Sequence, residues 1–327
     1  MLACHPVTLR RATLNLVTPP PCHLVTLNLA TNLAAMSLKS LALIFLLALT
    51  ACTPREQPPE PLASEAMPTR EWLPRGKPRA VVLALHGMND YSHAFALPGD
   101  YFAARGIALF AYDQRGFGAA RQPGIWAGEE NLVQDVAQQV RTLRSRFPRT
   151  PLYLLGESMG GAVAIVALSE PGFPPVDGVI LSAPAVWGEE TFQPAYRAVL
   201  WLVAHLAPGS RFDGSDLEIR ATDNIALLRQ MSVDPLILKD TRADAILGLV
   251  RLMDTAYQRA PQLHTPVLLL YGGKDEVIPP APIEALKARL PQPPTAKFYA
   301  GGYHMLLRDL GREAPLRDSV QWMLHRR

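Results

Sequence analysis

One short segment constrains the fold more than any other: an apolar run that breaks into Gly-x-Ser-x-Gly and continues with small residues, Leu154-Leu155-Gly156-Glu157-Ser158-Met159-Gly160-Gly161. The pattern predicts a buried strand that turns sharply into a helix and holds the Ser158 hydroxyl clear of the backbone. Side chains at Gly156 and Gly160 would meet the neighbouring strand or block the turn. Matches of this length also arise by chance, and the alternative is a glycine-rich turn whose serine only caps the helix.

From Thr69 onward, apolar runs of strand length alternate with helical segments. The 327 residues are enough for one large domain with an insertion. Buried strands alternating with helices are typical of a mostly parallel sheet with helices on both faces, so the predicted fold class is α/β. The predicted strands are 69–73, 80–85, 107–112, 151–155, 176–182, 267–271 and 297–300. The predicted helices between and after them are 93–105, 129–147, 159–168, 281–290 and 314–325.

The alternation stops after Pro184 and resumes at Val267. Helical patterns dominate the sequence between these residues, at 196–207, 224–231 and 242–258, and no convincing strand is found there. We therefore predict a helical cap at about 185–262, inserted between two consecutive strands of the sheet.

Two loops after late predicted strands carry the partners that a serine nucleophile needs. Asp275 follows strand 267–271, and His304 follows strand 297–300. Each has an ordinary alternative, Asp275 as a turn or N-cap residue and His304 as a surface loop residue. Serine, acid and histidine nevertheless occur in this order, each just past the carboxyl end of a strand, where open α/β sheets bind ligands. We predict Ser158 as nucleophile, Asp275 as acid and His304 as base, with Glu276 pointing elsewhere.

A nucleophile of this kind also needs two backbone N–H donors aimed at the developing oxyanion. One donor is expected from Met159, which follows Ser158. The other is expected from Met88, in the loop His86-Gly87-Met88-Asn89 after the first long strand. We expect His86 to position this loop and not to transfer protons. No metal or organic cofactor is expected.

These motifs resemble those of the monoacylglycerol lipase and lysophospholipase group of α/β-hydrolases. The resemblance rests on His86-Gly87, on Asp-Gln-Arg-Gly-Phe-Gly at 113–118, on the serine turn and on Tyr-His-Met-Leu at 303–306. It implies a mostly parallel sheet of the eight-stranded type with a helical cap. It also implies hydrolysis of carboxylic esters through a Ser-His-Asp triad and an acyl-enzyme, with single-chain lipid esters such as monoacylglycerol or lysophospholipid as substrates. Met88-Asn89 depart from the small residue and glycine often found after His-Gly.

Other functions remain open on this scaffold, because a fold does not fix a function. They are a small-ester esterase, a thioesterase, a peptidase and a lipoprotein binding module without catalysis, although the intact Ser158, Asp275 and His304 argue against the last. Helix 196–207 is apolar around much of its surface. Core packing of the cap explains this, and an acyl-chain tunnel or a surface resting on a bilayer is the alternative.

The N-terminal region has a different character. Residues 1–35 contain no acidic residue and repeat Thr-Leu-Asn-Leu, so we expect them to be disordered or untranslated. Residues 36–51 have the basic start and apolar stretch of a secretory signal. The small residues before Cys52 resemble the lipobox of bacterial lipoproteins, which implies acylation of Cys52. A plain signal peptide or a short core helix is the alternative. Residues 52–68 predict a flexible tether to the folded domain, 69–327.

The predicted partners follow from these features. A lipid or ester would be the substrate, and the acylated Cys52 would anchor an exported protein to a membrane of the cell envelope, on the periplasmic side or at the outer membrane. The net charge of +3 is small, and no cluster of basic residues interleaved with aromatics occurs. Nucleic acid is therefore not an expected partner.

Overall fold

The computed structural model describes residues 67–187, 194–213 and 219–325. The segment 1–35, the predicted signal 36–51, Cys52 and nearly all of the predicted tether 52–68 lie outside the described residues. The chain divides into two compact units, 1–56 and 57–327, and all described residues belong to the second.

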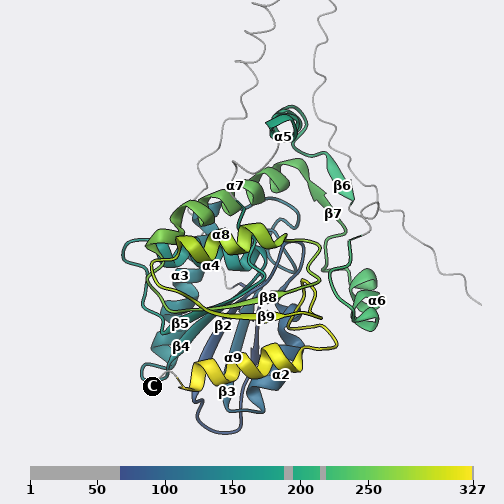
Figure 1. Ribbon diagram of the computed structural model, residues 1–327. Helices are drawn as coiled ribbons and strands as arrows, with labels where there is room; N and C mark the ends of the chain where they lie inside the picture. The colour runs from purple at the N-terminus through teal and green to yellow at the C-terminus, as the bar shows by residue number, and fades with distance from the viewer. Residues whose placement is uncertain (1–66, 188–193, 214–218, 326–327) are drawn as a thin grey trace, which may run out of the picture. The chain divides into compact units, whose positions relative to one another are not determined.

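A seven-stranded sheet forms the centre of this unit (Figure 1). Its order is β1-β3-β2-β4-β5-β8-β9, and all neighbours are parallel except β1 and β3. All residues of β2, β3, β4, β5 and β8 are buried, as expected for parallel strands covered on both faces. The strands are β1 (Thr69–Trp72), β2 (Ala80–Leu85), β3 (Ile107–Tyr112), β4 (Leu152–Glu157), β5 (Gly178–Ser182), β8 (Val267–Gly272) and β9 (Thr295–Tyr299).

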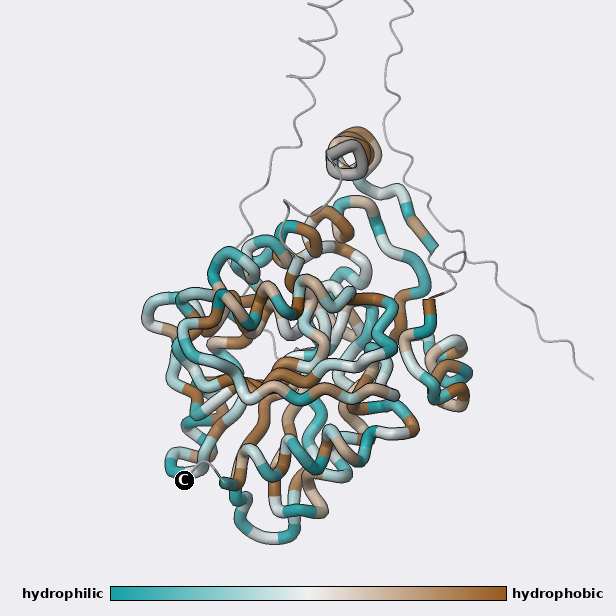
Figure 2. Tube along the Cα trace, viewed as in Figure 1, coloured by the Kyte–Doolittle hydropathy of each residue, from teal (hydrophilic) through white to brown (hydrophobic). Residues whose placement is uncertain are grey.

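Helices cover both faces of the sheet, which places a hydrophobic core on each side. One core contains residues of α3 (Glu129–Arg146), α4 (Met159–Ser169) and α8 (Pro280–Arg289). The other contains residues of the short helix η2 (Ser92–Phe95), α2 (Ala96–Ala103) and α9 (Glu313–His325). Figure 2 shows the most hydrophobic residues concentrated along the strands between these layers.

The seven predicted strands correspond to the seven strands of the sheet. The family resemblance implies a sheet of the eight-stranded type, and the described part of the chain forms seven strands of it. The sheet ends at β1, whose residues Thr69-Arg70-Glu71-Trp72 are mostly exposed and include two charges. Charged side chains of this kind are typical of an edge that does not accept another strand.

The predicted cap is present between β5 and β8 (Figure 1). The prediction that it contains no strand was wrong, because β6 and β7 pair antiparallel, with Arg211 opposite Arg242 and Asp213 opposite Asp240. Three-residue strands rich in charged residues carry no apolar alternation that a sequence pattern could show. The cap elements are α5 (Pro194–Leu206), β6 (Arg211–Asp213), α6 (Ile225–Val233), β7 (Asp240–Arg242), α7 (Ala243–Arg259) and the short helix η4 (Ala260–Gln262).

No helix within the described ranges is long and apolar enough to cross a membrane.

Candidate active site

Ser158 lies at the sharp turn between β4 and α4. Its backbone has φ 53° and ψ −118°, a left-handed conformation that is strained for any residue with a side chain. A Cβ on Gly156 would lie 2.5 Å from Gly160 O, and one on Gly160 would lie 2.1 Å from Leu85 O. Both glycines are therefore required by close contacts, as the sequence predicted.

Backbone hydrogen bonds hold this turn, while the Ser158 side chain stays partly accessible. Ser158 N–H donates to Ser182 O at 3.0 Å, and Ala185 N–H donates to Ser158 O at 2.9 Å. The loop after β2 passes beside the serine, since a Cβ on Gly87 would lie 3.4 Å from Ser158 Cβ. Ser158 Oγ has no hydrogen-bond partner among the residues that the structure describes. Hydrogen bonds of a reacting group often form only when substrate binds.

His304 and Asp275 meet at the same edge of the sheet, past the ends of β9 and β8. His304 Nδ1 lies 2.9 Å from Asp275 Oδ2, and the two side chains are 7% and 0% exposed. The other carboxylate oxygen, Asp275 Oδ1, accepts the N–H groups of Val277 and Ile278 at 2.8 and 2.9 Å. Asp275 is thus both a turn residue and the partner of His304. A carboxylate at Nδ1 keeps the proton on that nitrogen and leaves Nε2 free to accept another.

The neighbouring carboxylate, Glu276, points away from His304, as predicted. Its Oε2 accepts the backbone N–H of Arg220 at 2.7 Å. The loop 300–312 between β9 and α9 carries His304, and we call it the histidine loop. A second carboxylate, Asp309, supports this loop by accepting Tyr303 N–H at 2.7 Å and the Thr222 hydroxyl at 2.6 Å. Burial raises the pKa of Asp309. Since Thr222 belongs to the cap, the cap and the histidine loop are held together.

Met88 and Met159, the predicted oxyanion donors, both belong to segments that adjoin Ser158. Met159 is the first residue of α4, and Met88 follows Gly87, the residue that passes beside Ser158. In the described part of the chain, neither backbone N–H has a hydrogen-bond acceptor. The first N–H groups of a helix have no acceptor within it and favour negative charge. Both groups are therefore available to an anionic oxygen.

The loop that carries Met88 is fixed by His86, as predicted. Gln114 N–H donates to His86 Nε2 at 3.0 Å, so the ring proton lies on Nδ1 and is donated to Gly87 O at 2.8 Å. The His86 ring also packs on Phe117 in a T-shaped arrangement, with ring centroids 5.6 Å apart. Burial lowers the pKa of His86, which keeps it neutral. With both ring nitrogens engaged, His86 positions the loop and is not placed to carry protons.

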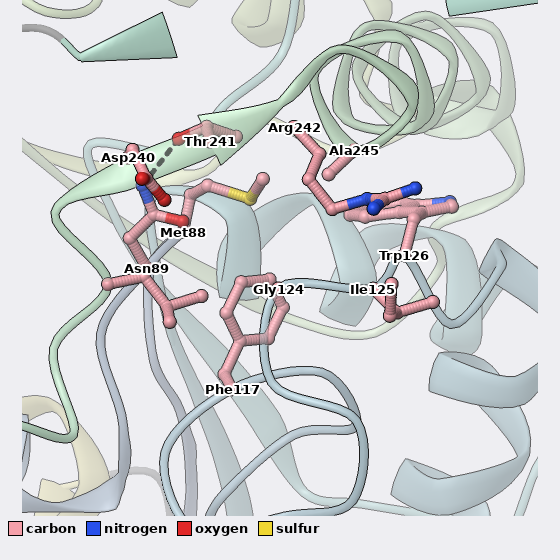
Figure 3. A pocket seen from close by; sticks show the side chains of 11 residues that line it. Met88, Asn89, Phe117, Gly124, Ile125, Trp126, Asp240, Thr241, Arg242 and Ala245 are labelled. Carbon is pink, nitrogen blue, oxygen red and sulfur yellow. Dashed lines mark hydrogen bonds between the residues drawn. The ribbon is translucent and has the colours of Figure 1, made fainter. Parts of the chain in front are cut away.

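The cap lies against residues 86–90, which we call the oxyanion loop, and a narrow pocket is found there (Figure 3). The side chains leave no space for a water molecule at its centre, so this is a closed arrangement. Figure 3 shows Phe117, Ile125 and Trp126 facing β7, to which Asn89 is hydrogen-bonded. The lining residues are Met88, Asn89, Phe117, Gly124, Ile125, Trp126, Leu238, Asp240, Thr241, Arg242 and Ala245.

Two features of the site were not found from the sequence. Asn89 joins the oxyanion loop to Thr241 of the cap, and Arg308 joins Glu157, beside the nucleophile, to Asp90. No sequence motif indicates these contacts, because each joins residues far apart in the chain.

Within the described ranges, no group of three or more histidine, cysteine or carboxylate side chains could hold a metal ion.

Comparisons with known proteins identify the family of this chain. A family model described as "Serine aminopeptidase, S33" matches residues 76–311. A monoacylglycerol lipase of Mycolicibacterium smegmatis is 28% identical over 260 residues, 77% of this chain and 91% of that protein. Human monoglyceride lipase is 28% identical over 249 residues, 74% of this chain and 80% of that protein.

Solved structures show the same fold. A soluble variant of Saccharomyces cerevisiae monoglyceride lipase, in complex with a substrate analogue, has a TM-score of 0.69 and 20% identity and covers 80% of this chain and 97% of its own. The monoacylglycerol lipase of Paleococcus ferrophilus has a TM-score of 0.67 and 21% identity and covers 80% of this chain and all of its own. The family match covers more than half of the chain, which therefore belongs to the serine aminopeptidase S33 family and has the α/β-hydrolase fold.

Proposed function

We propose that this protein hydrolyses carboxylic esters of single-chain lipids through Ser158, His304 and Asp275. The observation that carries the proposal is the buried His304–Asp275 pair at the sheet edge where Ser158 is held in a strained turn. Strain of this kind is commonly found at active sites. The names of the monoacylglycerol and monoglyceride lipases similar to this chain support the substrate class.

The proposed reaction has two halves. Ser158 Oγ attacks the ester carbonyl carbon while His304 Nε2 takes the hydroxyl proton, and the oxyanion is bound by the N–H groups of Met88 and Met159. The tetrahedral intermediate collapses, the C–O bond to the alcohol breaks, and His304 returns its proton to the leaving oxygen. Water then attacks the acyl-enzyme with the same proton transfers, which releases the fatty acid and restores Ser158. Asp275 stabilises the imidazolium form of His304 in both halves.

The side chains between the loop that carries Met88 and the cap support an apolar substrate over a peptide with a free amino terminus. An ammonium group would need an unpaired carboxylate or several acceptors to replace its hydration. The carboxylate in the pocket lining, Asp240, is already paired with Arg211, and the lining also includes Met88, Phe117, Ile125, Trp126 and Leu238. Peptidase activity, which the family description names, is therefore the second candidate.

The outer face of α5 gives further support to a lipid substrate. Val199, Trp201 and Leu206 are 59%, 50% and 64% exposed, so core packing does not explain these residues, contrary to that interpretation of the sequence. Ala204 of the same helix is buried, and α5 lies on α7, away from the sheet (Figure 1). An exposed apolar helix of the cap is suited to resting on a lipid surface.

The proposed location is a membrane of the bacterial cell envelope. An acylated Cys52 would hold the enzyme at the surface where single-chain lipids occur, with residues 52–68 as the tether. Several acyl chains on one residue make a stable anchor, whereas a single chain binds only marginally. The exposed face of α5 would then meet lipid without having to anchor the protein alone.

Labelling with a fluorophosphonate tests the proposed function. Wild-type protein should be labelled at Ser158, and Ser158→Ala should lose the label and reduce ester turnover by a factor on the order of 10⁶. Ser169→Ala is a matched control, because Ser169 at the end of α4 bonds the backbone O of Ile165. Monoacylglycerols and lysophospholipids should compete for the label better than short esters, thioesters or peptides. Near-normal turnover by Ser158→Ala would disprove the assignment.

A further inference from the structure

The buried side chain of Arg308 contacts two carboxylates that belong to different parts of the site. Its Nη1 donates to Asp90 Oδ2 at 2.7 Å, and its Nη2 donates to Glu157 Oε1. The side chains of Arg308, Asp90 and Glu157 are 3%, 7% and 3% exposed. The three residues therefore form a buried cluster of one cation and two carboxylates, which we call the Arg308 cluster.

Each member of the Arg308 cluster is close in the chain to a group of the proposed mechanism. Glu157 directly precedes Ser158, Asp90 follows Met88 by two residues, and Arg308 follows His304 by four. The carboxylates lie 151 and 218 residues from Arg308 in the sequence. One guanidinium thus connects the serine turn, the oxyanion loop and the histidine loop, which come from three separate strand ends.

The backbone around Arg308 makes this connection stiff. Arg308 N–H donates to Met305 O at 2.8 Å, which closes a turn next to His304. Arg308 O accepts the side-chain amide of Asn224 at 3.0 Å. At the other end, Asp90 Oδ1 accepts Tyr91 N–H at 2.8 Å, which fixes the direction of its carboxylate. A movement of Arg308 would therefore move the histidine loop with it.

Stability alone does not explain this cluster. Removing three charged groups from water carries a large desolvation penalty, and packed apolar residues often stabilise a core equally well. Burial would lower the pKa of Arg308, but the charges of Glu157 and Asp90 raise it above its ordinary value, so the cation is retained. Arg308 Nε is buried and has no hydrogen-bond partner among the described residues. An unpaired buried donor is a further cost.

We propose that Arg308 is a positioning residue. Through its ion pairs with Glu157 and Asp90, it holds His304 in the correct position relative to Ser158 and the oxyanion donors. The inference rests on the proposed function, since it concerns the same reacting groups. Arg308 itself touches no substrate. Small errors in the mutual placement of reacting groups reduce the rate strongly, so loss of the cluster should lower kcat and leave KM nearly unchanged.

Two conservative variants test this role. Arg308→Lys keeps the charge but cannot donate to two carboxylates in the planar geometry of a guanidinium, and Glu157→Gln keeps the accepting oxygen but removes the charge. We expect each to lower kcat on a soluble ester at least tenfold, per active site titrated with fluorophosphonate, with KM changed less than twofold. Arg144→Lys is the matched control, because Arg144 bonds Asp177, Thr150 and Pro175 near the amino ends of β4 and β5, away from Ser158.

A second measurement does not depend on activity. The proton on His304 Nδ1, bonded to Asp275, should give a low-field signal in the proton NMR spectrum that is absent from His304→Gln. In Arg308→Lys and Glu157→Gln this signal should shift or exchange faster with water, whereas Arg144→Lys should match wild type. If wild type is neither labelled nor active but the signal moves as expected, the proposed function fails and the positioning role stands.

The outcomes that overturn the inference are equally distinct. A variant that melts at lower temperature but keeps its kcat per titrated site and its His304 signal would show that the cluster is only structural. If Arg308→Lys does not fold, Glu157→Gln carries both measurements, because it preserves the volume of the side chain and its hydrogen bond to Arg308.

Discussion

Asn89 donates from its side-chain amide to the hydroxyl of Thr241 at 2.6 Å, and this bond joins the oxyanion loop to strand β7 of the cap. A second hydrogen bond also joins this loop to the cap, because Leu238 N–H donates to Asn89 O at 3.1 Å. Asn89 has φ 64°, a left-handed conformation that asparagine tolerates better than most residues. Because Met88 directly precedes Asn89, we expect the position of the cap to affect the direction of the Met88 N–H.

Replacing Thr241 by valine should therefore weaken catalysis without disrupting the core. Valine keeps the shape of threonine but removes the acceptor of Asn89, whose amide oxygen is already buried without a partner in the described part of the chain. A lost hydrogen bond of about 1 kcal/mol corresponds to a roughly fivefold lower kcat/KM if it is made fully in the transition state. Steady-state kinetics on a soluble ester would measure it. Thr142→Val, which removes an exposed hydroxyl on α3, is the control, and equal kinetics of the two variants would refute the link.

Replacing Asp275 by asparagine should reverse the proton arrangement of His304. The asparagine oxygen can still accept the N–H groups of Val277 and Ile278, so the loop should remain folded. Its amide would donate to His304 Nδ1, which forces the ring proton onto Nε2 and prevents proton transfer from Ser158. We expect kcat to fall on the order of 10⁴-fold, by analogy with other triads. Glu276→Gln, one residue away, should be nearly normal, and a mild effect of Asp275→Asn would contradict the role of Asp275.

Much of the sheet could be predicted because parallel strands buried on both faces are continuous apolar runs. The bounds of β2 and β3 are the predicted ones, 80–85 and 107–112, and β4 differs because it continues to Glu157. Glycine, serine and histidine were placed correctly at the strand ends, since the turns there impose residue types. The predicted range of edge strand β9 was displaced, because an exposed strand lacks a strong apolar signal. The strand begins at Thr295, whereas the prediction began at Lys297.

Contacts between distant charged residues could not be predicted. Glu157 could equally have been a buried structural partner or a group that tunes the nucleophile, and only the fold shows that it faces Arg308. Arg308 stands in a loop where a charged residue is normally solvent-exposed, and no local pattern marks its burial. For helix α5 the sequence left core packing and an exposed surface both open, because an apolar helix is normally covered, and only the fold shows that Trp201 is exposed.

Removing the proposed lipid anchor should release the protein from membranes. Cys52→Ala cannot be acylated, and without several acyl chains the remaining apolar contact should bind only reversibly. We expect Cys52→Ala in the soluble fraction after a salt wash and wild type in the membrane fraction, measured by fractionation and by the mass of the mature N-terminus. Cys22→Ala, upstream of the predicted signal, should behave as wild type. If Cys52→Ala stays in the membrane fraction, another part of the protein anchors it.

The buried His86 should make the folded state less stable in acid. Burial lowers its pKa from the ordinary value of 6.5, so below this pH the unfolded chain binds a proton that the folded chain does not. The stability due to His86 is thus complete above pH 6.5 and is lost as the pH falls toward the lowered pKa, by up to about 1.4 kcal/mol per pH unit.

His86→Gln removes this titration and also the ring that accepts Gln114 N–H, so it should be less stable than wild type at pH 8. The difference between the two proteins should shrink between pH 7 and pH 5, as wild type loses the contribution of His86. Urea unfolding at each pH measures the free energy of unfolding of both proteins. Subtracting the value for His86→Gln from that for wild type cancels the contribution of the acidic groups that the two proteins share. A difference between wild type and His86→Gln that stays constant with pH would show that His86 binds a proton equally in both states.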